Sequence, residues 1–239
     1  MPNPFFHFKQ FTVHQDRCAM KVCTDACLFG AWVAREIAGD DVVSNILDIG
    51  TGTGLLSLLL AQKNNASIDA VELSTDAASQ ASENFVASPW KSRLKIHHCD
   101  IRRFDPAYQY DLIISNPPFF EDDLKSEDEH RNTAMHSTTF TLDELLKQIK
   151  RLLKQNGAAA VLIPFHRNNY FENILELNGF FIKEVMQVKQ TVRHTFFRSM
   201  YIFTKYSQGK NEGEITIQNE EKQYTAAFAA LLKDYYLKL

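Results

Sequence analysis

Leu47-Asp48-Ile49-Gly50-Thr51-Gly52-Thr53-Gly54-Leu55 is the stretch that decides the fold. It joins an apolar run at 44–49 to a segment with helical spacing at 55–62, so its glycines lie where a strand turns into a helix. Because glycine has no Cβ atom, the backbone there can turn tightly and come close to a ligand. The spacing is Gly-x-Gly-x-Gly, whereas a dinucleotide-binding loop reads Gly-x-Gly-x-x-Gly and needs glycine at Leu55. Ligand binding is therefore predicted for this loop; a NAD or flavin site and a glycine-rich turn without a ligand are the alternatives.

Around this loop, short apolar runs alternate with longer amphipathic stretches. Strands are predicted over 44–49, 68–73, 94–98, 111–115 and 158–163, and helices over 55–62, 75–86, 142–153 (stopped by Asn156-Gly157) and 169–178. This alternation is typical of a parallel sheet with helices on both faces. Two more runs, 181–190 and 197–204, are too close in sequence for a helix between them and predict an antiparallel hairpin at one edge. The expected fold is a Rossmann-like α/β domain with a seven-stranded, mostly parallel sheet.

Length and composition limit the class of protein. With 239 residues and 45% apolar content, the chain fits one globular domain, 1–239. Within it we expect an N-terminal covering segment (1–41), a catalytic core (42–205) and a C-terminal extension (213–239) docked on the core. No run approaches the roughly 18 apolar residues of a membrane span. The first seven residues lack the basic start and apolar run of a secretory signal.

The cysteines and the charge narrow the class further. The four cysteines are Cys18, Cys23, Cys27 and Cys99, with no Cys-x-x-Cys pair among them. Packed thiols in a reducing, cytoplasmic compartment are therefore predicted, and a structural zinc site is the alternative. The formal charge of −3 argues against a protein that coats nucleic acid, although a local basic face is sufficient for a nucleic-acid enzyme.

Acidic residues follow the next two predicted strands. Glu72 comes about twenty residues after the glycine loop, where a carboxylate can accept both ribose hydroxyls of a nucleoside; a solvated strand-end acid is the alternative. With Asp48 ahead of it, the loop resembles that of class I S-adenosylmethionine (SAM)-dependent methyltransferases, in which it passes under the methionine part of the cofactor. The resemblance implies that Asp100 accepts from the adenine amino group and that Ile101 packs on the ring. The cofactor residues in the core are thus Asp48, Gly50, Gly52, Gly54, Glu72, Asp100 and Ile101.

Asn116-Pro117-Pro118-Phe119 directly follows the fourth strand. An aromatic amine or amide nitrogen is a poor nucleophile because its lone pair is delocalised. Two fixed acceptors for its N–H bonds, the Asn116 side-chain oxygen and the Pro117 carbonyl, favour a pyramidal nitrogen that can attack a methyl group, and Phe119 can stack on a planar target. The prolines restrict the backbone and so preorganise both acceptors. The tetrad resembles the (Asp/Asn/Ser)-Pro-Pro-(Tyr/Phe) motif of amino-methyltransferases; a rigid loop exit is the alternative.

Several amino-methyltransferase families share this tetrad, so the flanking sequence must separate them. Only about forty residues precede the first core strand, which disfavours the N-terminal helical domain of enzymes that methylate release-factor glutamine. The core uses nearly the whole chain, which disfavours the separate recognition domain of DNA adenine methyltransferases and the duplicated half of ribosomal guanine-N2 enzymes.

The N-terminal segment Met20-Lys21-Val22-Cys23-Thr24-Asp25 is more specific. It resembles the Met-Lys-Val-Gly-Thr-Asp segment of bacterial valine-tRNA adenine-N6 methyltransferases, which modify the adenine beside the anticodon. The tail 228–236 also resembles the ending of that family. The resemblance implies that Lys21, Thr24 and Asp25 lie against the cofactor, with Cys23 standing where the family has glycine.

The segment after the tetrad, 121–139, is long and charged, as functional loops often are. Phe119 stands where the family usually has tyrosine, which keeps stacking and removes a polar contact. The resemblance implies substrate contacts for Phe120, Arg131 and His136. Our hypothesis is that the segment closes over a flipped base with Arg131 facing phosphate; a plain solvated loop is the alternative.

Two groups of basic residues are candidates for an RNA face, although such stripes are more often solvated surface. The groups are Lys91, Arg93, Lys95, Arg102 and Arg103, and Lys147, Lys150, Arg151 and Lys154. The expected activity is SAM-dependent methylation of the N6 amino group of a tRNA adenine next to the anticodon, by base flipping. A monomer without metal is expected. The alternatives are methylation of guanine N2 or adenine N6 in ribosomal RNA or of protein glutamine, and a non-enzymatic SAM-binding scaffold.

Overall fold

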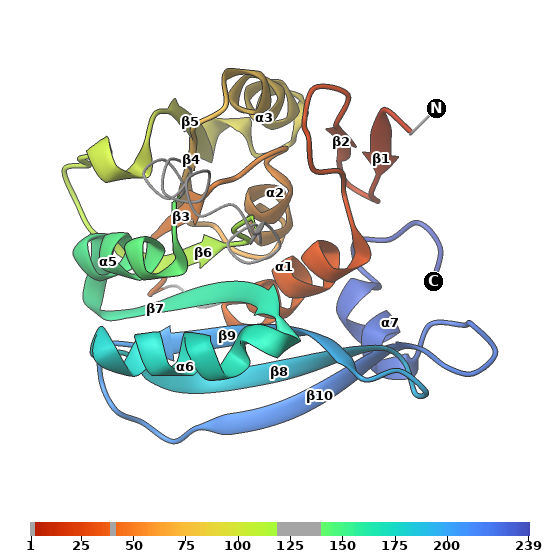
Figure 1. Ribbon diagram of the computed structural model, residues 1–239. Coiled ribbons are helices and arrows are strands. Elements are labelled where there is room, and N and C mark those ends of the chain that lie inside the picture. Colours follow the sequence, from red (N-terminus) through yellow and green to blue (C-terminus); the bar gives the residue numbers. More distant parts are fainter. Residues whose placement is uncertain (1–2, 39–41, 119–139) are drawn as a thin grey trace, which may run out of the picture.

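One large sheet organises the chain in the computed structural model, which describes residues 3–38, 42–118 and 140–239 (Figure 1). The described strands have the order β10-β8-β9-β7-β6-β3-β4-β5. Their bounds are β3 Asn45–Ile49, β4 Ser67–Glu72, β5 Leu94–His98, β6 Tyr110–Ser115, β7 Leu153–Pro164, β8 Phe181–Thr191, β9 Phe196–Thr204 and β10 Asn211–Gln218. Strands β3 to β7 run parallel, and β9 lies antiparallel to both β7 and β8. The predicted mostly parallel sheet with an antiparallel hairpin is confirmed.

The strand count is a correction, because the sheet has eight strands where seven were predicted. The additional strand is β10, which pairs parallel to β8 with Ile215 opposite Val188. The sequence signal was weak because only Ile215 and Ile217 are apolar in a charged segment, and both are buried. The hairpin β8–β9 therefore lies one strand in from the edge, and β10 forms the edge with charged residues that suit an exposed position.

The described helices are α1 Thr24–Glu36, α2 Leu55–Ala61, α3 Thr75–Ala87, α5 Leu142–Leu152, α6 Asn168–Leu177 and α7 Ala226–Leu232, with short 3-10 turns η1 Lys91–Arg93, η2 Ile101–Arg103 and η3 Phe165–Arg167. The four predicted helices, α2, α3, α5 and α6, begin within one residue of their predicted positions. Helix α5 starts with a capping box between Thr141 and Glu144. It ends before the predicted Asn156-Gly157 stop, which lies inside β7 instead. Gly157 is needed there because a Cβ atom would lie 3.0 Å from the Asp111 carbonyl oxygen on the neighbouring strand.

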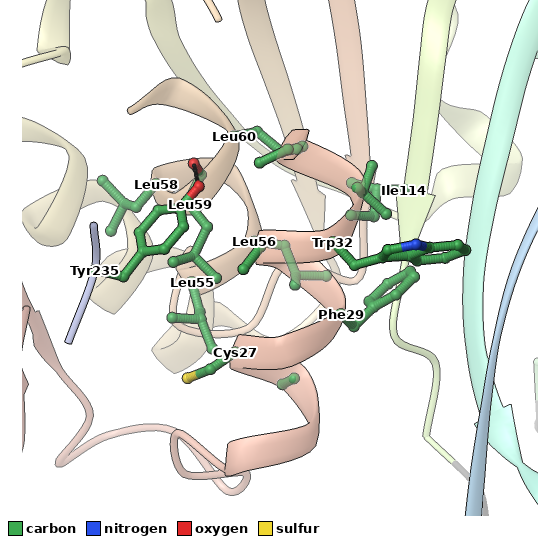
Figure 2. Close-up of a cluster of buried hydrophobic side chains, with 14 of the residues drawn as sticks. Cys27, Phe29, Trp32, Leu55, Leu56, Leu58, Leu59, Leu60, Ile114 and Tyr235 are labelled. Carbon is green, nitrogen blue, oxygen red and sulfur yellow. Dashed lines mark hydrogen bonds between the residues drawn. The ribbon is translucent and has the colours of Figure 1, made fainter. Parts of the chain in front are cut away.

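Helices cover both faces of the sheet (Figure 1). On one face, α1 and α2 form an apolar cluster with β6 in which Phe29 and Trp32 approach Ile114 (Figure 2). On the other face, α5 and α6 pack over β6 and β7. None of the described helices is long and apolar enough to cross a bilayer.

The two end segments of the described chain lie together and brace the glycine-loop region. A small hairpin, β1 (Phe5–His7) and β2 (Thr12–His14), precedes α1. The Lys9 amide donates to the Tyr235 carbonyl at 2.8 Å, and the Tyr235 hydroxyl donates to the Leu59 carbonyl of α2 at 3.0 Å. The structure thus ties both end segments to the helix that leaves the glycine loop.

Candidate active site

The candidate residues of the core meet at the carboxyl edge of the parallel strands. Ile49 pairs with both Val71 and Ser115, so the glycine loop, the end of β4 and Asn116 lie at the same level. The Ser115 hydroxyl donates to the Ile49 carbonyl at 2.9 Å and ties the end of β6 to the start of the loop. Ligands of open α/β sheets bind at this edge.

The glycine loop has a backbone that other residues adopt only with strain. The φ angles of Gly50, Gly52 and Gly54 are 69°, 56° and 84°. A Cβ atom at Gly50 or Gly52 would meet nothing within 4 Å, whereas one at Gly54 would lie 2.5 Å from the Phe85 ring. The first two glycines therefore face open space on the ligand side, and the third packs against α3.

The hydrogen-bond partners of the backbone amides in this loop distinguish between the possible ligands. Gly50 and Thr51 donate to the Val71 carbonyl, and Gly54 donates to the Thr51 carbonyl. The Gly52 amide donates to Glu72 Oε2 at 2.9 Å. A loop that holds a pyrophosphate directs such amides at the ligand. All four amides donate to acceptors within the protein and are not free to bind a pyrophosphate. This arrangement argues against the NAD or flavin alternative.

Asp48 lies buried beneath the loop with one oxygen satisfied and the other not. Its Oδ2 accepts from the Thr51 hydroxyl at 2.6 Å and from the Ser57 amide and hydroxyl at 3.2 and 2.7 Å. Its Oδ1 is buried and has no hydrogen-bond partner within the described ranges. Burial raises the pKa of Asp48 to about 6. A buried acceptor without a partner is costly, so Oδ1 fits a cationic or hydrogen-bond-donating ligand group.

Glu72 and Asp100 present carboxylates at the ends of neighbouring strands. Glu72 is oriented by the Gly52 amide on Oε2 and the Ser74 amide on Oε1, at 2.9 Å each. Asp100 accepts from the Arg102 amide at 2.9 Å and from the Arg102 guanidinium at 2.6 to 3.0 Å. These bonds from Arg102 are the main reason why the pKa of Asp100 lies below its usual value. Ile101 is buried beside Asp100.

Asn116 carries the second buried acceptor without a partner. Its Oδ1 is shielded from solvent and has no hydrogen-bond partner in the part of the chain that the structure describes. Pro117 is buried and Pro118 is exposed. The other predicted tetrad and substrate residues, Phe119, Phe120, Arg131 and His136, lie outside the described residues.

The N-terminal candidates lie in α1 and the segment before it, where they make contacts of their own. Lys21 Nζ donates to the Gln15 carbonyl and, at 2.9 Å, to the Cys18 carbonyl. Thr24 is the first residue of α1. Asp25 pairs with Arg198 of β9 at 2.8 Å.

At Cys23, which caps α1, φ is −126°, a conformation open to any residue. Glycine is therefore not required for the backbone at that position.

Sequence analysis missed three supports of the site. Buried Asn84 on α3 accepts from the His14 amide at 2.9 Å and donates to the His14 and Thr53 carbonyls at 2.9 and 2.8 Å, so it joins β2 to the glycine loop. The sequence feature that could have identified Asn84 is a side-chain amide at a position where the helix pattern predicts a core residue. The other two, Arg102 on Asp100 and Arg198 on Asp25, gave no signal because their partners are set by tertiary structure.

Comparison with solved structures shows the fold class. A predicted O-methyltransferase from Agrobacterium tumefaciens superposes with a TM-score of 0.66 at 14% identity, covering 88% of this chain and 96% of that chain. The methyltransferase subunit of a type I restriction-modification system from Streptococcus thermophilus has a TM-score of 0.61 at 17% identity, covering 96% of this chain and 53% of that chain. The fold is that of the methyltransferases.

Sequence comparison gives the family. Residues 34–197 match the model of the methyltransferase small domain. A protein of Cytophaga hutchinsonii named tRNA1(Val) (adenine(37)-N6)-methyltransferase is 42% identical, and one of the same name from Bacteroides fragilis is 40% identical, each over 100% of both chains. This chain therefore belongs to the methyltransferase small domain family and, within it, to the family of these relatives. The predicted family membership is confirmed.

Proposed function

We propose that this protein transfers the methyl group of SAM to the N6 amino group of an adenine next to the anticodon of tRNA, in a valine tRNA by likeness to its relatives. The observation that carries the proposal is the buried, unpartnered Oδ1 of Asn116 at the carboxyl edge, beside the open side of the glycine loop. An acceptor kept without a partner in the protein suits a substrate N–H group.

The residues around the loop fit SAM. Gly50 and Gly52 leave space for the methionine part, and Asp48 Oδ1 would accept from its ammonium group. Glu72 would accept from the ribose hydroxyls with its remaining lone pairs. Asp100 and Ile101 would contact the adenine of the cofactor, while Lys21, Thr24 and Asp25 would lie against the cofactor from the N-terminal side. When bound, SAM supplies an electrophilic methyl group on a sulfonium.

The tetrad would activate the target nitrogen. Asn116 Oδ1 and the Pro117 carbonyl accept its two N–H bonds, and the prolines hold both acceptors in place, so no reorganisation is required during reaction. The nitrogen lone pair would form a bond to the methyl carbon as the methyl–sulfur bond breaks and its electron pair goes to sulfur. The methylated nitrogen would then lose a proton to solvent without a dedicated base. Stacking by Phe119 and contacts of Phe120, Arg131 and His136 with the RNA complete the proposal.

We further infer a cytoplasmic monomer that forms a single domain, with 1–41 and 213–239 supporting the core. Its chemistry requires no metal ion. Within the described ranges, His, Cys, Asp and Glu side chains do not gather into a group that could hold one.

The test is transfer of labelled methyl from SAM to total tRNA that lacks this modification, followed by nucleoside analysis. N6-methyladenosine is the expected product, and Asn116→Ala should lower the rate constant of transfer by about 100- to 1000-fold, the cost of losing one preorganised donor or acceptor. Label in ribosomal RNA or protein instead of tRNA would contradict the proposed substrate. Full transfer by Asn116→Ala would contradict the proposed chemistry.

A further inference from the structure

The connection between β8 and β9 carries a run of basic residues at the same edge as Asn116. Residues 189–198 contain Lys189, Arg193, His194 and Arg198 and no acidic residue. Arg198 pairs with Pro164 at the carboxyl end of β7, so β9 starts, and β8 ends, at this edge (Figure 1). Strands lie about 4.8 Å apart, which places β9 about 10 Å from β6. The turn therefore lies within reach of nucleotides next to a base held at Asn116.

Most of the other basic residues predicted as candidates for an RNA face donate hydrogen bonds to, or form ion pairs with, other residues of the protein. Arg93 donates to the carbonyls of Ala61 and Ala66, and Arg102 holds Asp100. On α5, Lys150 donates to Asn178 and Arg151 donates to Ile101 and Phe104, and at the start of β7 Lys154 pairs with Asp111. Lys147 of α5 forms an exposed pair with Asp143. Lys91 and Lys95 lie toward the amino end of β5, away from the site.

The basic side chains in and next to the turn form ion pairs with acidic residues that follow in the sequence. Arg193, whose side chain is 76% exposed, pairs with Glu220 at 3.2 Å, and Lys189 pairs with Glu214 at 3.2 Å. The Arg193–Glu220 pair is exposed, and exposed ion pairs contribute about 0 to 1 kcal/mol, so phosphate can replace Glu220 at little cost. The Lys189 side chain is 24% exposed. Lys189 Nζ also lies 4.3 Å from the ring centroid of Phe196.

An enzyme that flips a base must also bind the nucleotides on either side of that base. Enzymes that take a base out of its stack must fix the flanking backbone, and phosphate contacts supply that positioning. The chain as a whole is acidic, with a formal charge of −3, so these contacts must come from a local basic surface. The exposed cations of the turn meet this requirement at the edge where the chemistry is proposed.

We propose that the β8–β9 turn binds, through Lys189, Arg193 and His194, the phosphates next to the target adenine of tRNA. The proposal rests on the proposed function, because it names how the same substrate is held.

The test compares the double variant Lys189→Gln/Arg193→Gln with a control, Lys183→Gln/Lys210→Gln, that removes the same charge from the other end of the sheet. Lys183 lies near the start of β8, and Lys210 directly precedes β10, which begins opposite Glu184. Lys210 is also an exposed, ion-paired lysine, bonded to Glu212 at 2.6 Å. Affinity for unmodified tRNA and the kinetics of methyl transfer are measured between 50 and 200 mM salt. SAM affinity and thermal unfolding of each variant establish that the fold is intact.

We expect the double variant to lose two phosphate contacts. The slope of log affinity against log salt should then become shallower than that of wild type by about 1.4 to 1.8. Over a tenfold decrease in salt, from 1 M to 0.1 M, the double variant should therefore gain roughly 25- to 60-fold less affinity than wild type. The KM for tRNA should rise while kcat at saturating tRNA stays close to wild type. If the double variant unfolds, Arg193→Gln alone, at a highly exposed position, should show about half of this slope change.

Equal tRNA affinity and equal salt dependence of the double variant and the control would overturn the proposal and leave the proposed function standing. A wild-type protein that methylates no tRNA would instead contradict the proposed function, and with it this proposal. Glu220→Gln supplies an independent check, because releasing Arg193 should strengthen tRNA binding.

Discussion

Gly52→Ala distinguishes a cofactor loop from a strained turn. The residue has a φ of 56°, and its ligand side is open, with no atom within 4 Å of an added Cβ. Gly179, at the end of α6, is the matched control, because its φ is 76° and an added Cβ would meet only Lys150 Nζ, at 3.8 Å. Left-handed backbone costs alanine about 1 to 2 kcal/mol at either place. Both variants should therefore unfold about 2 to 8 °C below wild type.

Only Gly52→Ala should affect SAM binding. A methyl group inserted into a packed contact costs about 1 to 3 kcal/mol, which weakens binding by about 5- to 140-fold. Isothermal titration of SAM into wild type and both variants, below their unfolding temperatures, measures this difference. Wild-type SAM affinity in Gly52→Ala, or an equal loss in Gly179→Ala, would refute the assignment of the loop to the cofactor.

Two further predictions concern stability. The pKa of Asp48 is about 6 in the folded protein, above its ordinary value, so the folded state binds the proton more tightly than the unfolded state. The free energy of unfolding should therefore fall by on the order of 1 to 3 kcal/mol as pH rises from about 4 to about 6, and level off above that. Asp48→Asn should remove this decline, and urea unfolding at several pH values checks it; an unchanged decline would show that Asp48 is not its source. Asn84→Ala should lower the free energy of unfolding by about 2 to 4 kcal/mol, because it leaves the buried Thr53 carbonyl and the partly buried backbone groups of His14 without their partner. A loss below about 1 kcal/mol in denaturant unfolding would contradict that bridging role.

Local pattern was sufficient for the core of the fold. Strand β5 has its predicted bounds, and the glycine loop and the tetrad lie at strand ends as predicted, because strand burial and turn chemistry are properties of neighbouring residues. Strand β10 was left out of the predicted sheet, because its place there depends on pairing with β8 and on the burial of two isoleucines, which the local sequence does not show. Edge strands depend on tertiary context more than on their own sequence.

The site was predictable in its positions and much less in its partners. Sequence pattern placed Asp48, Glu72 and Asn116 at one edge, since the ends of parallel strands coincide there. It assigned Arg102 to an RNA face, whereas the structure shows it bonded to Asp100. It also passed over the basic β8–β9 turn, because which cations remain exposed depends on where each carboxylate and carbonyl lies in the folded chain.

The most direct test of the account is methyl transfer by wild type and Asn116→Ala to tRNA lacking the modification, with SAM affinity measured in parallel. The account predicts N6-methyladenosine in tRNA with wild type, and transfer reduced by about 100- to 1000-fold with unchanged SAM affinity in Asn116→Ala. Undiminished transfer by the variant would contradict the role of the buried Asn116 oxygen. Wild type that leaves tRNA unlabelled would contradict the proposed substrate.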